Sequence, residues 1–306
     1  MICSIKSNNG SVMTLEQLRI FIAVAEKEHL TQAASELHLT PSAVSSAIRT
    51  LEDRYSATLF NRIGRRIELT DDGRIFLDEA RATLARARAA ELTLSELGGL
   101  KRGSLSIFAS QTIASYWMPP LLARFKAEFP AINVALHIGN THSVAEATRE
   151  GIADLGFVEG TIYEPSLHIK RVGEDLLILV VGKDHPWITH PPAGFADLVQ
   201  DGQWILREEG SGTRAVYEDA LRAQGFAPEQ LKIALELPSN EAVCSAVQSG
   251  VYATVISELA AAPHLLSGRL IRIAIALPQR QFLMVSHKER YRTKAAQALI
   301  DLLPAC

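Results

Sequence analysis

The sequence predicts a protein of the α/β class whose first third is almost entirely helical. Apolar residues recur at helical spacing through residues 14–54 and again through residues 72–97. After Gly103, short apolar runs of strand length alternate with helical segments, which is the pattern of parallel sheets covered by helices. The paired glycines Gly98 and Gly99 separate the two patterns and favour a break in the chain.

The chain has 306 residues and an ordinary globular composition, with 47% hydrophobic residues, 21% charged residues and a net charge of −3. This length suits about two domains, each with its own core. No purely apolar run is longer than Leu176 to Val181, which is far shorter than the ~20 residues of a membrane-spanning helix, so no membrane partner is expected. Three widely spaced cysteines argue against a disulfide framework or a zinc site and favour a reducing cytoplasm.

The charge is unevenly distributed along the chain. Residues 1–12 are polar and pattern-free, and we expect them to form an extra, unstructured tail without a role. Residues 13–102 carry 13 basic and 13 acidic residues, whereas residues 103–306 carry 17 basic and 21 acidic ones. A total near zero argues against a nucleic-acid partner only if the charge is evenly spread. The charge of each segment, and not the total, therefore indicates whether a nucleic-acid partner is expected.

Three helices are predicted before residue 55. The first covers residues 14–28 and has one apolar face. Thr31 is expected to be the N-cap of a second, short helix. Pro41, with Thr40 as the cap before it, begins a third helix that reaches about Arg54.

The third helix has an apolar face and, nearly opposite, a face of small hydroxyl residues with one arginine. Hydroxyls can meet DNA phosphates or base edges in the major groove, and an arginine can pair with guanine. A solvated helix face has the same composition, so this helix alone leaves both interpretations open. The residues of the polar face are Ser42, Ser45, Ser46 and Arg49.

The neighbouring segments favour DNA. Two short helices joined by a tight turn form a helix-turn-helix pattern, and residues 60–70 predict a two-stranded hairpin, or wing, with a basic tip. Residues 49–66 contain five arginines against Glu52 and Asp53, and such cations neutralise phosphates. The predicted DNA contacts are Thr31, Gln32, Thr40, Pro41, Ser42, Ser45, Ser46, Arg49, Arg62, Arg65 and Arg66.

About sixty residues of this region resemble the winged-helix signature of the LysR-type transcriptional regulators. The resemblance implies a winged helix-turn-helix DNA-binding domain over residues 13–71, a recognition helix that begins at Pro41, and double-stranded promoter DNA as a partner. The chain departs from the family at residues 54–57, where a Leu-Gly turn is usual. The matching segments are Leu30-Thr31-Gln32-Ala33-Ala34, Leu37-His38-Leu39-Thr40-Pro41-Ser42-Ala43-Val44-Ser45, Leu59-Phe60-Asn61-Arg62 and Leu69-Thr70, followed by Gly73.

A long helix is predicted from Asp71 and Asp72 to about Leu97. A helix of roughly 25 residues spans about 38 Å, which is too long for so small a domain to cover, although packing against that domain is the alternative. The family resemblance implies a linker and dimerisation helix over residues 72–102, a homodimer on paired half-sites, and a homotetramer as a dimer of dimers. The coiled-coil-like seam consists of Leu77, Ala80, Leu84, Ala87 and Leu94.

Residues 103–306 resemble, more loosely, the effector-binding half of the same family, which is like the type 2 periplasmic binding proteins. The resemblance implies two α/β lobes joined by crossover strands. Lobe I would comprise residues 103–162 and 267–306, and lobe II residues 163–266. The segments that carry the resemblance are Asp154-Leu155-Gly156-Phe157, Val180-Val181-Gly182-Lys183-Asp184-His185-Pro186 and Gly250-Val251-Tyr252.

The clearest ligand site lies between Arg207 and Arg214, after a predicted strand and at the start of a helix. Backbone N–H groups there can converge on an anion, so we expect an oxyanion or a small carboxylate as the effector. Helix capping by Ser or Thr is the alternative. Together with two further strand ends that the family resemblance places in one cleft, the predicted effector contacts are Ser110, Gln111, Thr112, Gly210, Ser211, Gly212, Thr213, Arg214, Asn240 and Glu241.

The sequence thus predicts a cytoplasmic DNA-binding transcriptional regulator whose second half binds a small metabolite and thereby shifts lobe closure and the spacing or bend of the DNA. RNA polymerase is a further possible partner, and no catalytic residue, metal or cofactor is expected. One alternative is a DNA-tethered hydrolase or transferase with Ser211 or Thr213 as nucleophile and a histidine as base, although no G-x-S-x-G elbow is present. A structural DNA-compacting protein is the other, and the large α/β half argues against it.

Overall fold

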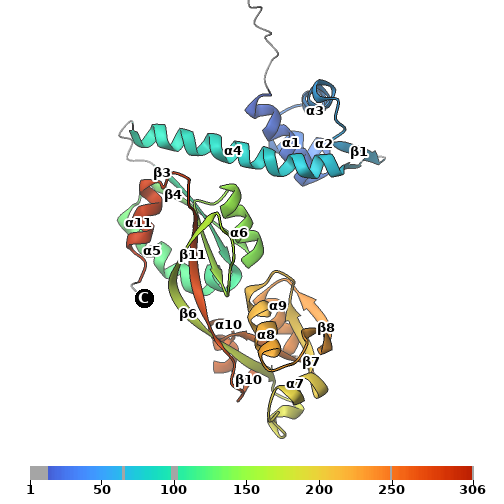
Figure 1. The fold of residues 1–306 in the computed structure, drawn as a ribbon, viewed down its shortest axis with the longest axis vertical. Helices are drawn as coiled ribbons and strands as arrows, with labels where there is room; N and C mark the ends of the chain where they lie inside the picture. Colours follow the sequence, from blue (N-terminus) through green and yellow to red (C-terminus); the bar gives the residue numbers. More distant parts are fainter. Residues whose placement is uncertain (1–12, 64–65, 98–102, 249, 305–306) are drawn as a thin grey trace, which may run out of the picture. The chain divides into compact units, whose positions relative to one another are not determined.

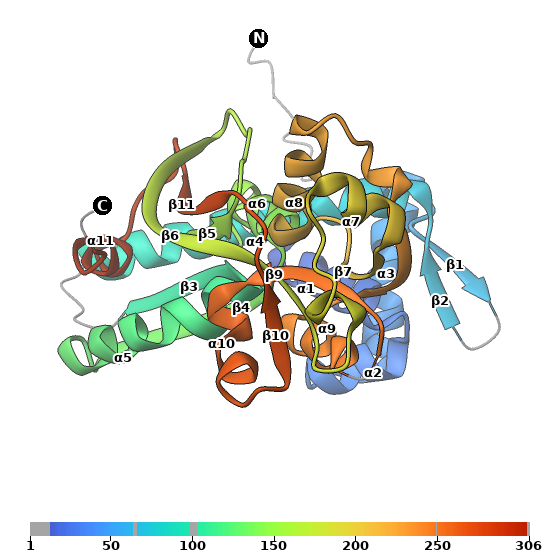
Figure 2. The same ribbon diagram turned by 90° about the horizontal axis from the view of Figure 1, so that it is seen from below.

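The computed structural model of the chain describes residues 13–63, 66–97, 103–248 and 250–304. They form two compact units that divide between Glu91 and Leu92, and each unit has a hydrophobic core of its own. The expectations for residues 1–12 and for Arg65 lie outside the described residues. Figure 1 and Figure 2 show the elements in two views.

The first unit packs three helices and a hairpin around Phe21. The Phe21 ring is fully buried, and its centroid lies 5.3 Å from that of Phe60 on the hairpin and 4.8 Å from that of Phe76 on the fourth helix. These rings join the helices to the hairpin in one core. The elements are α1 (Leu15–Lys27), α2 (Leu30–Glu36), α3 (Pro41–Tyr55), β1 (Phe60–Ile63), β2 (Arg66–Leu69) and α4 (Asp71–Leu97).

A cap residue sets the start of one of these helices, α3, as predicted. The Thr40 hydroxyl accepts a hydrogen bond from the Ala43 N–H at 3.2 Å, and Pro41 occupies the first turn of α3. The start of α2 differs from the prediction. Its N-cap is His29, without a side-chain cap bond, because the helix already begins at Leu30 and places Thr31 inside the first turn.

The turn after α3 contains a residue in the left-handed conformation, although the family's usual glycine is absent there. Ser56 takes a left-handed backbone conformation with φ 51° and ψ 38°, which glycine adopts more readily than serine. The Glu52 carboxylate then accepts hydrogen bonds from the N–H groups of Leu59 at 2.8 Å and Phe60 at 3.2 Å. Glu52 therefore fixes the chain where it leaves the turn and enters the hairpin.

Gly73 is required where α4 begins beside the chain that leads into the hairpin. A Cβ on Gly73 would lie 2.2 Å from the Leu59 carbonyl oxygen, so only glycine allows this approach. The Thr70 hydroxyl accepts from the Gly73 N–H at 2.9 Å and donates to the Thr58 carbonyl at 2.7 Å. These contacts attach the start of α4 to the first unit.

The predicted seam along α4 is divided between two environments. Ala80 and Leu84 are buried in the core of the first unit, and Leu77 packs against the same core. Leu94, near the end of the helix, is 70% exposed. The first half of the seam therefore follows the alternative of packing against the protein's own domain, whereas Leu94 does not.

The second unit is built on one continuous, mixed sheet of nine described strands. In the described part of the chain, no helix has both the length and the apolar character that crossing a membrane requires. The strands are β3 (Gly103–Ser110), β4 (Ile132–Gly139), β5 (Leu155–Glu159), β6 (Leu167–Gly182), β7 (Gln203–Arg207), β8 (Lys232–Leu237), β9 (Ala253–Ser257), β10 (Leu270–Ile273) and β11 (Gln279–His287). The helices are α5 (Met118–Glu128), α6 (Thr141–Glu150), α7 (Phe195–Asp201), α8 (Gly212–Ala223), α9 (Asn240–Val247), α10 (Glu258–Leu266) and α11 (Lys294–Asp301), with a π-helical turn at Ile113–Trp117.

The sheet has the strand order β4-β3-β5-β11-β6-β9-β7-β8, and β10 also pairs with β6. β3 runs parallel to β4 and β5, and β7 runs parallel to β8 and β9. The prediction of parallel sheets therefore holds for these two groups. β6, β10 and β11 pair antiparallel instead, and the single strand β6 passes from one group to the other.

The two lobes are joined by β6 and β11. Residues 167–171 of β6 pair with residues 283–287 of β11 in lobe I, whereas residues 177–182 pair with β9 and β10 in lobe II. The expected lobe boundaries near Tyr163 and Leu266 are therefore wrong. The chain crosses later in both directions, because residues 167–171 still belong to the sheet of lobe I and β10 still belongs to that of lobe II.

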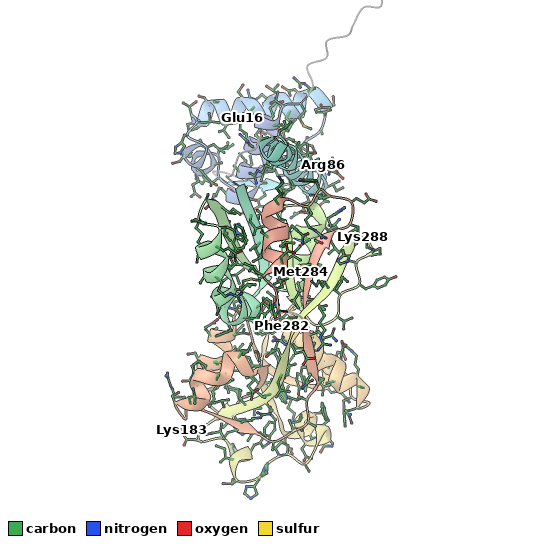
Figure 3. All side chains as sticks on the ribbon, turned by 90° about the vertical axis from the view of Figure 1, so that its left-hand side faces the viewer. Glu16, Arg86, Lys183, Phe282, Met284 and Lys288 are labelled. Atoms are coloured by element: carbon green, nitrogen blue, oxygen red, sulfur yellow. The ribbon has the colours of Figure 1, made fainter. Side chains whose placement is uncertain are left out.

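Each lobe has three layers. In lobe I, α5 and α11 pack on one face of the strands, together with Phe282 and Met284 of β11 (Figure 3), and α6 packs on the other face. In lobe II, α7 and α8 cover one face, and α9 and α10 cover the other. The carboxyl ends of β3, β5 and β7 carry Ser110, Glu159 and Arg207, which places polar residues where the lobes meet.

Candidate functional site

The face of α3 opposite the core is polar and exposed. Val44, Ile48 and Leu51 are buried in the first unit, as the helical spacing predicts. Arg62 and Arg66 occupy positions in the paired strands β1 and β2 on either side of the hairpin tip. Of the predicted DNA contacts on the helices, Ser45 is half-buried and the exposed ones are Thr31, Gln32, Thr40, Pro41, Ser42, Ser46 and Arg49.

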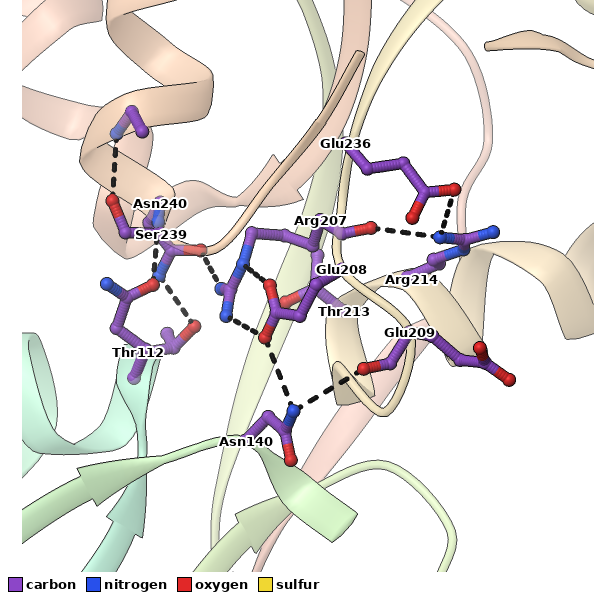
Figure 4. Close-up of polar contacts among 12 residues, drawn as sticks. Thr112, Asn140, Arg207, Glu208, Glu209, Thr213, Arg214, Glu236, Ser239 and Asn240 are labelled. Carbon is purple, nitrogen blue, oxygen red and sulfur yellow. Dashed lines mark hydrogen bonds and ion pairs between the residues drawn. The ribbon is translucent and has the colours of Figure 1, made fainter. Parts of the chain in front are cut away.

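In the second unit, the three predicted effector segments meet between the lobes (Figure 4). Asn240, at the start of α9 in lobe II, donates from Nδ2 to the Thr112 hydroxyl of lobe I at 3.1 Å. Its backbone N–H donates to Gln111 Oε1 at 2.6 Å. The residues of these segments that are at least 98% buried are Ser110, Thr112, Ser211, Thr213 and Asn240.

Further hydrogen bonds hold the lobes together at two edges of this cleft. On one side, Gln111 Nε2 and the Tyr116 hydroxyl of lobe I donate to the two carboxylate oxygens of Glu241, at 3.0 and 2.7 Å. Burial and the bond to Glu241 raise the pKa of Tyr116, so its hydroxyl remains a donor. On the other side, Asn140 Nδ2 donates to the Glu209 carbonyl at 3.4 Å, and the His142 N–H donates to the Gly210 carbonyl at 3.4 Å.

Ion pairs of two buried guanidiniums lie in the interior of the cleft, and sequence reasoning missed them. Arg207 binds Glu208 through Nε at 2.8 Å and Nη2 at 2.9 Å, and its Nη1 donates to Asn240 Oδ1 at 2.6 Å. Burial opposes the ionisation of Glu208, but the hydrogen bonds and charge of Arg207 lower the pKa of its carboxyl. Figure 4 shows Arg207 between Asn240 and Glu208. Arg207 is therefore a fixed charge inside the site.

Arg280 on β11 is the second fixed charge. Its guanidinium donates from Nε to Asp175 of β6 at 2.8 Å, from Nη1 to the Thr213 hydroxyl at 2.8 Å and from Nη2 to the Thr112 hydroxyl at 3.2 Å. Arg280 thus contacts both lobes from the crossover. Nothing in the local sequence pattern of β11 distinguishes this residue from a surface arginine.

In the predicted loop, Arg214 is placed differently from expectation, and Ser211 does not follow the helix-capping alternative. The Arg214 guanidinium pairs with Glu218 at 2.7 Å and Glu236 at 2.9 Å, so it turns toward β8 and away from Asn240 (Figure 4). Ser211 is the N-cap residue of α8, yet its hydroxyl makes no cap bond and has no hydrogen-bond partner among the described residues. Helix capping therefore does not account for Ser211, whereas Ser239 does cap α9.

The start of α8 approaches lobe I too closely for a side chain. A Cβ on Gly212 would lie 2.4 Å from the Glu159 carbonyl oxygen and 2.5 Å from the Thr141 hydroxyl. Beside this contact, a cavity of about 340 Å³ lies between α6 and the start of α8. Its volume suits a small ligand. Its lining includes Thr141, His142, Glu159, Gly210 and Gly212.

Two family models match the chain. The model described as "LysR substrate binding domain" matches residues 98–305, and the model described as "Bacterial regulatory helix-turn-helix protein, lysR family" matches residues 15–74. The uncharacterized HTH-type transcriptional regulator YeiE of Escherichia coli is 30% identical over 291 residues, which cover 94% of this chain and 96% of YeiE. The HTH-type transcriptional activator CmpR of Synechocystis is 30% identical over 294 residues, covering 95% and 94% of the two chains.

Solved structures show the same fold. The LysR family regulator CbnR superimposes with a TM-score of 0.69 at 21% identity and covers 95% of this chain and 98% of its own. Full-length CbnR in a complex with its target DNA gives a TM-score of 0.68 at 22% identity, with 95% and 99% covered. The effector-binding domain of QuiR in complex with shikimate gives 0.59 at 19% identity and covers 66% of this chain and 95% of its own.

The contact at Gly212 predicts a difference between two glycine variants. In Gly212→Ala, the added methyl group meets the Glu159 carbonyl, and such overpacking lowers the free energy of unfolding by about 1–3 kcal/mol. Gly194→Ala is the matched control, because no atom lies within 4 Å of the place that its added methyl group would take and surface changes cost about 0.5 kcal/mol or less. Urea denaturation of the full chain measures both. Equal stability of the two variants would contradict the close approach of α8 to lobe I.

Proposed function

The chain belongs to the LysR family of bacterial transcriptional regulators, and we propose which segment of the chain performs each function of such a regulator. The protein is a DNA-binding transcriptional regulator with an effector-binding domain. We assign DNA binding to residues 13–71, pairing of two copies to residues 72–102 and effector binding to residues 103–306. Because its target is chromosomal DNA, we place the protein in the cytoplasm.

For the DNA contacts, we assign base reading to α3 and phosphate binding to the hairpin arginines. The support is that α3 keeps its apolar residues in the core while Ser42, Ser46 and Arg49 stay exposed. Small hydroxyls allow the helix to approach the base edges, and an arginine can pair with guanine. Arg62 and Arg66 of the hairpin strands, and Arg65 between them in the sequence, would then meet the DNA backbone beside the groove.

Arginine variants test this assignment on a DNA site selected from a random library. Arg49→Ala should lower affinity for the selected site by about 1–3 kcal/mol and relax its base preference, because a base contact is lost. Arg66→Ala should weaken binding to all sequences similarly and reduce the salt slope by about one unit, because a phosphate contact is lost. Fluorescence polarisation at several salt concentrations measures both effects.

The control for these variants is Arg124→Ala, which removes an exposed arginine of α5 in the second unit and should leave DNA affinity unchanged. If Arg49→Ala and Arg66→Ala also leave affinity and salt slope unchanged, the assigned DNA surface is wrong.

LysR regulators oligomerise, and we propose that this chain forms a homodimer through the second half of α4. The support is the exposure of Leu94, an apolar residue of the predicted seam that its own unit does not cover. A two-fold dimer would present two copies of α3 to paired half-sites. Pairing of two dimers into a tetramer and contact with RNA polymerase are the further steps that we propose.

A charge in the exposed part of the seam should separate the copies. Leu94→Asp places a carboxylate where two helices would pack. The dissociation constant of the dimer should therefore rise by at least about tenfold, equal to about 1.4 kcal/mol. Sedimentation equilibrium over a concentration series measures this. Leu266→Asp is the control, since Leu266 is 91% exposed at the end of α10. If Leu94→Asp associates as strongly as the wild type, the dimer interface does not lie on the second half of α4.

For the effector, we propose that the cleft between the lobes binds a small oxyanion or carboxylate. The observation that carries this proposal is the Ser211 hydroxyl, which is buried at the start of α8 and caps nothing. A helix start favours negative charge, and buried polar groups normally have partners. The guanidiniums of Arg207 and Arg280, each paired with its own carboxylate, hold Asn240 and Thr213 in place in the same cleft. QuiR, which has this fold, was solved with shikimate in its effector-binding domain.

Two serine variants should separate ligand binding from helix capping. Ser211→Ala should keep the stability of the free protein but weaken the stabilisation by a bound anion, because the lost hydroxyl has no protein partner among the described residues. Ser239→Ala should lose about 1 kcal/mol of stability as an N-cap and keep anion binding. A thermal-shift series with sulfate, phosphate and small carboxylates measures the stability of each free variant and its stabilisation by each anion.

Arg214→Ala completes this series as a control, since its guanidinium is paired with Glu218 and Glu236; it should keep anion binding. A bound anion whose stabilisation is unaffected by Ser211→Ala would remove the start of α8 from the effector site.

A further inference from the structure

The inner cleft holds one more carboxyl group than guanidinium groups. Arg207 is paired by two hydrogen bonds with Glu208. Arg280 is paired with Asp175, whose Oδ2 lies 2.8 Å from Nε and 2.6 Å from Nη2, and whose Oδ1 accepts from the Ser257 hydroxyl at 2.9 Å. Each guanidinium therefore has a carboxylate of its own. Glu159, at the end of β5, is the additional carboxyl group.

Glu159 is too buried and too incompletely paired to hold a full charge at low cost. It is 2% exposed, and its Oε1 lies 3.3 Å from Nη1 of Arg280, which also donates to Thr213. Its Oε2 has no hydrogen-bond partner among the described residues. An ionised carboxylate in such a place is costly unless it is fully paired. Burial raises the pKa of Glu159, and the charge of Asp175 adds to this rise. The charges of Arg280 and Arg207 and a hydrogen bond from the Thr112 side chain oppose it.

The charged groups around Glu159 lie partly in the interior of the cleft and partly at the mouth of the adjacent cavity. Arg280 of β11, Asp175 of β6 and Arg207 of β7 face it from the interior. Most groups at the mouth of the adjacent cavity are exposed, so water and salt screen them. These groups are His142, Glu146 and Arg149 of α6, Glu164, and Asp219 of α8.

Two other buried polar groups, near the ends of neighbouring elements, also have no partner among the described residues. They are the hydroxyls of Ser110, at the end of β3, and Ser211, at the start of α8. Glu159 itself lines the cavity between α6 and α8. A hydroxyl and a protonated carboxyl can each donate one hydrogen bond. Each of these unused polar groups is therefore able to donate a hydrogen bond to a ligand, and Glu159 is the one that lines the cavity.

We propose that Glu159 binds the effector as a neutral carboxylic acid and donates its O–H to an oxygen of an anionic ligand. The proposal rests on the anion-binding function assigned to this cleft, and it adds one residue and one proton to that function. When Glu159 ionises, the same position presents a negative charge to the anion and loses its donor. Anion binding and deprotonation of Glu159 therefore exclude each other.

This exclusion predicts the direction of the pH dependence. Below the raised pKa of Glu159, the donor form is fully populated and affinity for the anion does not change with pH. Above that pKa, affinity falls by up to about tenfold per pH unit, because each binding event must first restore one proton. The ligand itself must not titrate in this range, so sulfate is the probe of choice.

The test measures sulfate affinity of the full chain by calorimetry between about pH 5 and about pH 9 in cationic buffers. The wild type should bind more weakly as pH rises, whereas Glu159→Gln should bind with the low-pH affinity of the wild type at every pH. The glutamine keeps an N–H donor at the same position and cannot ionise. Glu128→Gln, which changes an exposed carboxylate of α5, should retain the wild-type profile.

The outcomes distinguish this proposal from the assigned function. If sulfate binds to the wild type with the same affinity at all pH values, or if Glu159→Gln keeps the wild-type pH dependence, the role of Glu159 is wrong and the anion site stands. If sulfate and the small carboxylates bind at no pH, the anion site itself is wrong, and the role of Glu159 with it.

A second measurement needs no ligand. The infrared spectrum of the wild type at neutral pH should contain the C=O stretch of a protonated carboxylic acid, and this band should disappear in Glu159→Gln and persist in Glu128→Gln. A wild-type spectrum without that band at neutral pH would overturn the proposal independently of sulfate binding.

Discussion

The ion pair between Arg280 and Asp175 is the interaction on which the second unit depends. The two residues are direct neighbours on the crossover strands β11 and β6, and both are buried. Breaking a buried pair by removing one partner leaves an uncompensated charge, which costs about 3–5 kcal/mol. From this position the guanidinium also donates to Thr112 of lobe I and Thr213 of lobe II. The Arg280 side chain thus links the two crossover strands and positions a hydroxyl from each lobe.

The charge pattern of the cleft follows from that pair. Because Asp175 neutralises Arg280 and Glu208 neutralises Arg207, the guanidiniums serve mainly as fixed hydrogen-bond donors. Selectivity for an anion must then come from the helix start at Gly212 and from hydroxyls such as Ser211, together with a neutral Glu159. Such a site attracts an anion without the long-range field of an unpaired cation, so the shape of the cavity decides which anion fits.

The sequence was sufficient for features that depend on neighbours along the chain. Helical spacing and the Thr40-Pro41 start predicted α3 to within one residue at its end, and the hairpin followed from residues 60–70. Thr31 was misplaced because a threonine can stand in the first turn of a helix as well as at its cap. The buried charges were not predictable, because Arg280 meets Thr112 and Thr213 only through the crossover, 168 and 67 residues away. The lobe crossings were misplaced for the same reason.

The contacts between the lobes are suited to a reversible closure. Outside the Arg280 group, the described hydrogen bonds between the lobes are those of Asn240, Gln111, Tyr116, Asn140 and His142, and Tyr116 also packs against the core of lobe II. A hydrogen bond between neutral groups contributes only about 0.5–1.5 kcal/mol net, and one to the Glu241 carboxylate about 1.5–3 kcal/mol, since water replaces it when the lobes separate. A ligand that binds the closed form more tightly by about 1–3 kcal/mol therefore competes with the loss of one or two of them. Because Gly212 allows α8 to touch lobe I, occupancy of the adjacent cavity acts directly on this contact. The effector can thus shift the lobes with the free energy of a few hydrogen bonds.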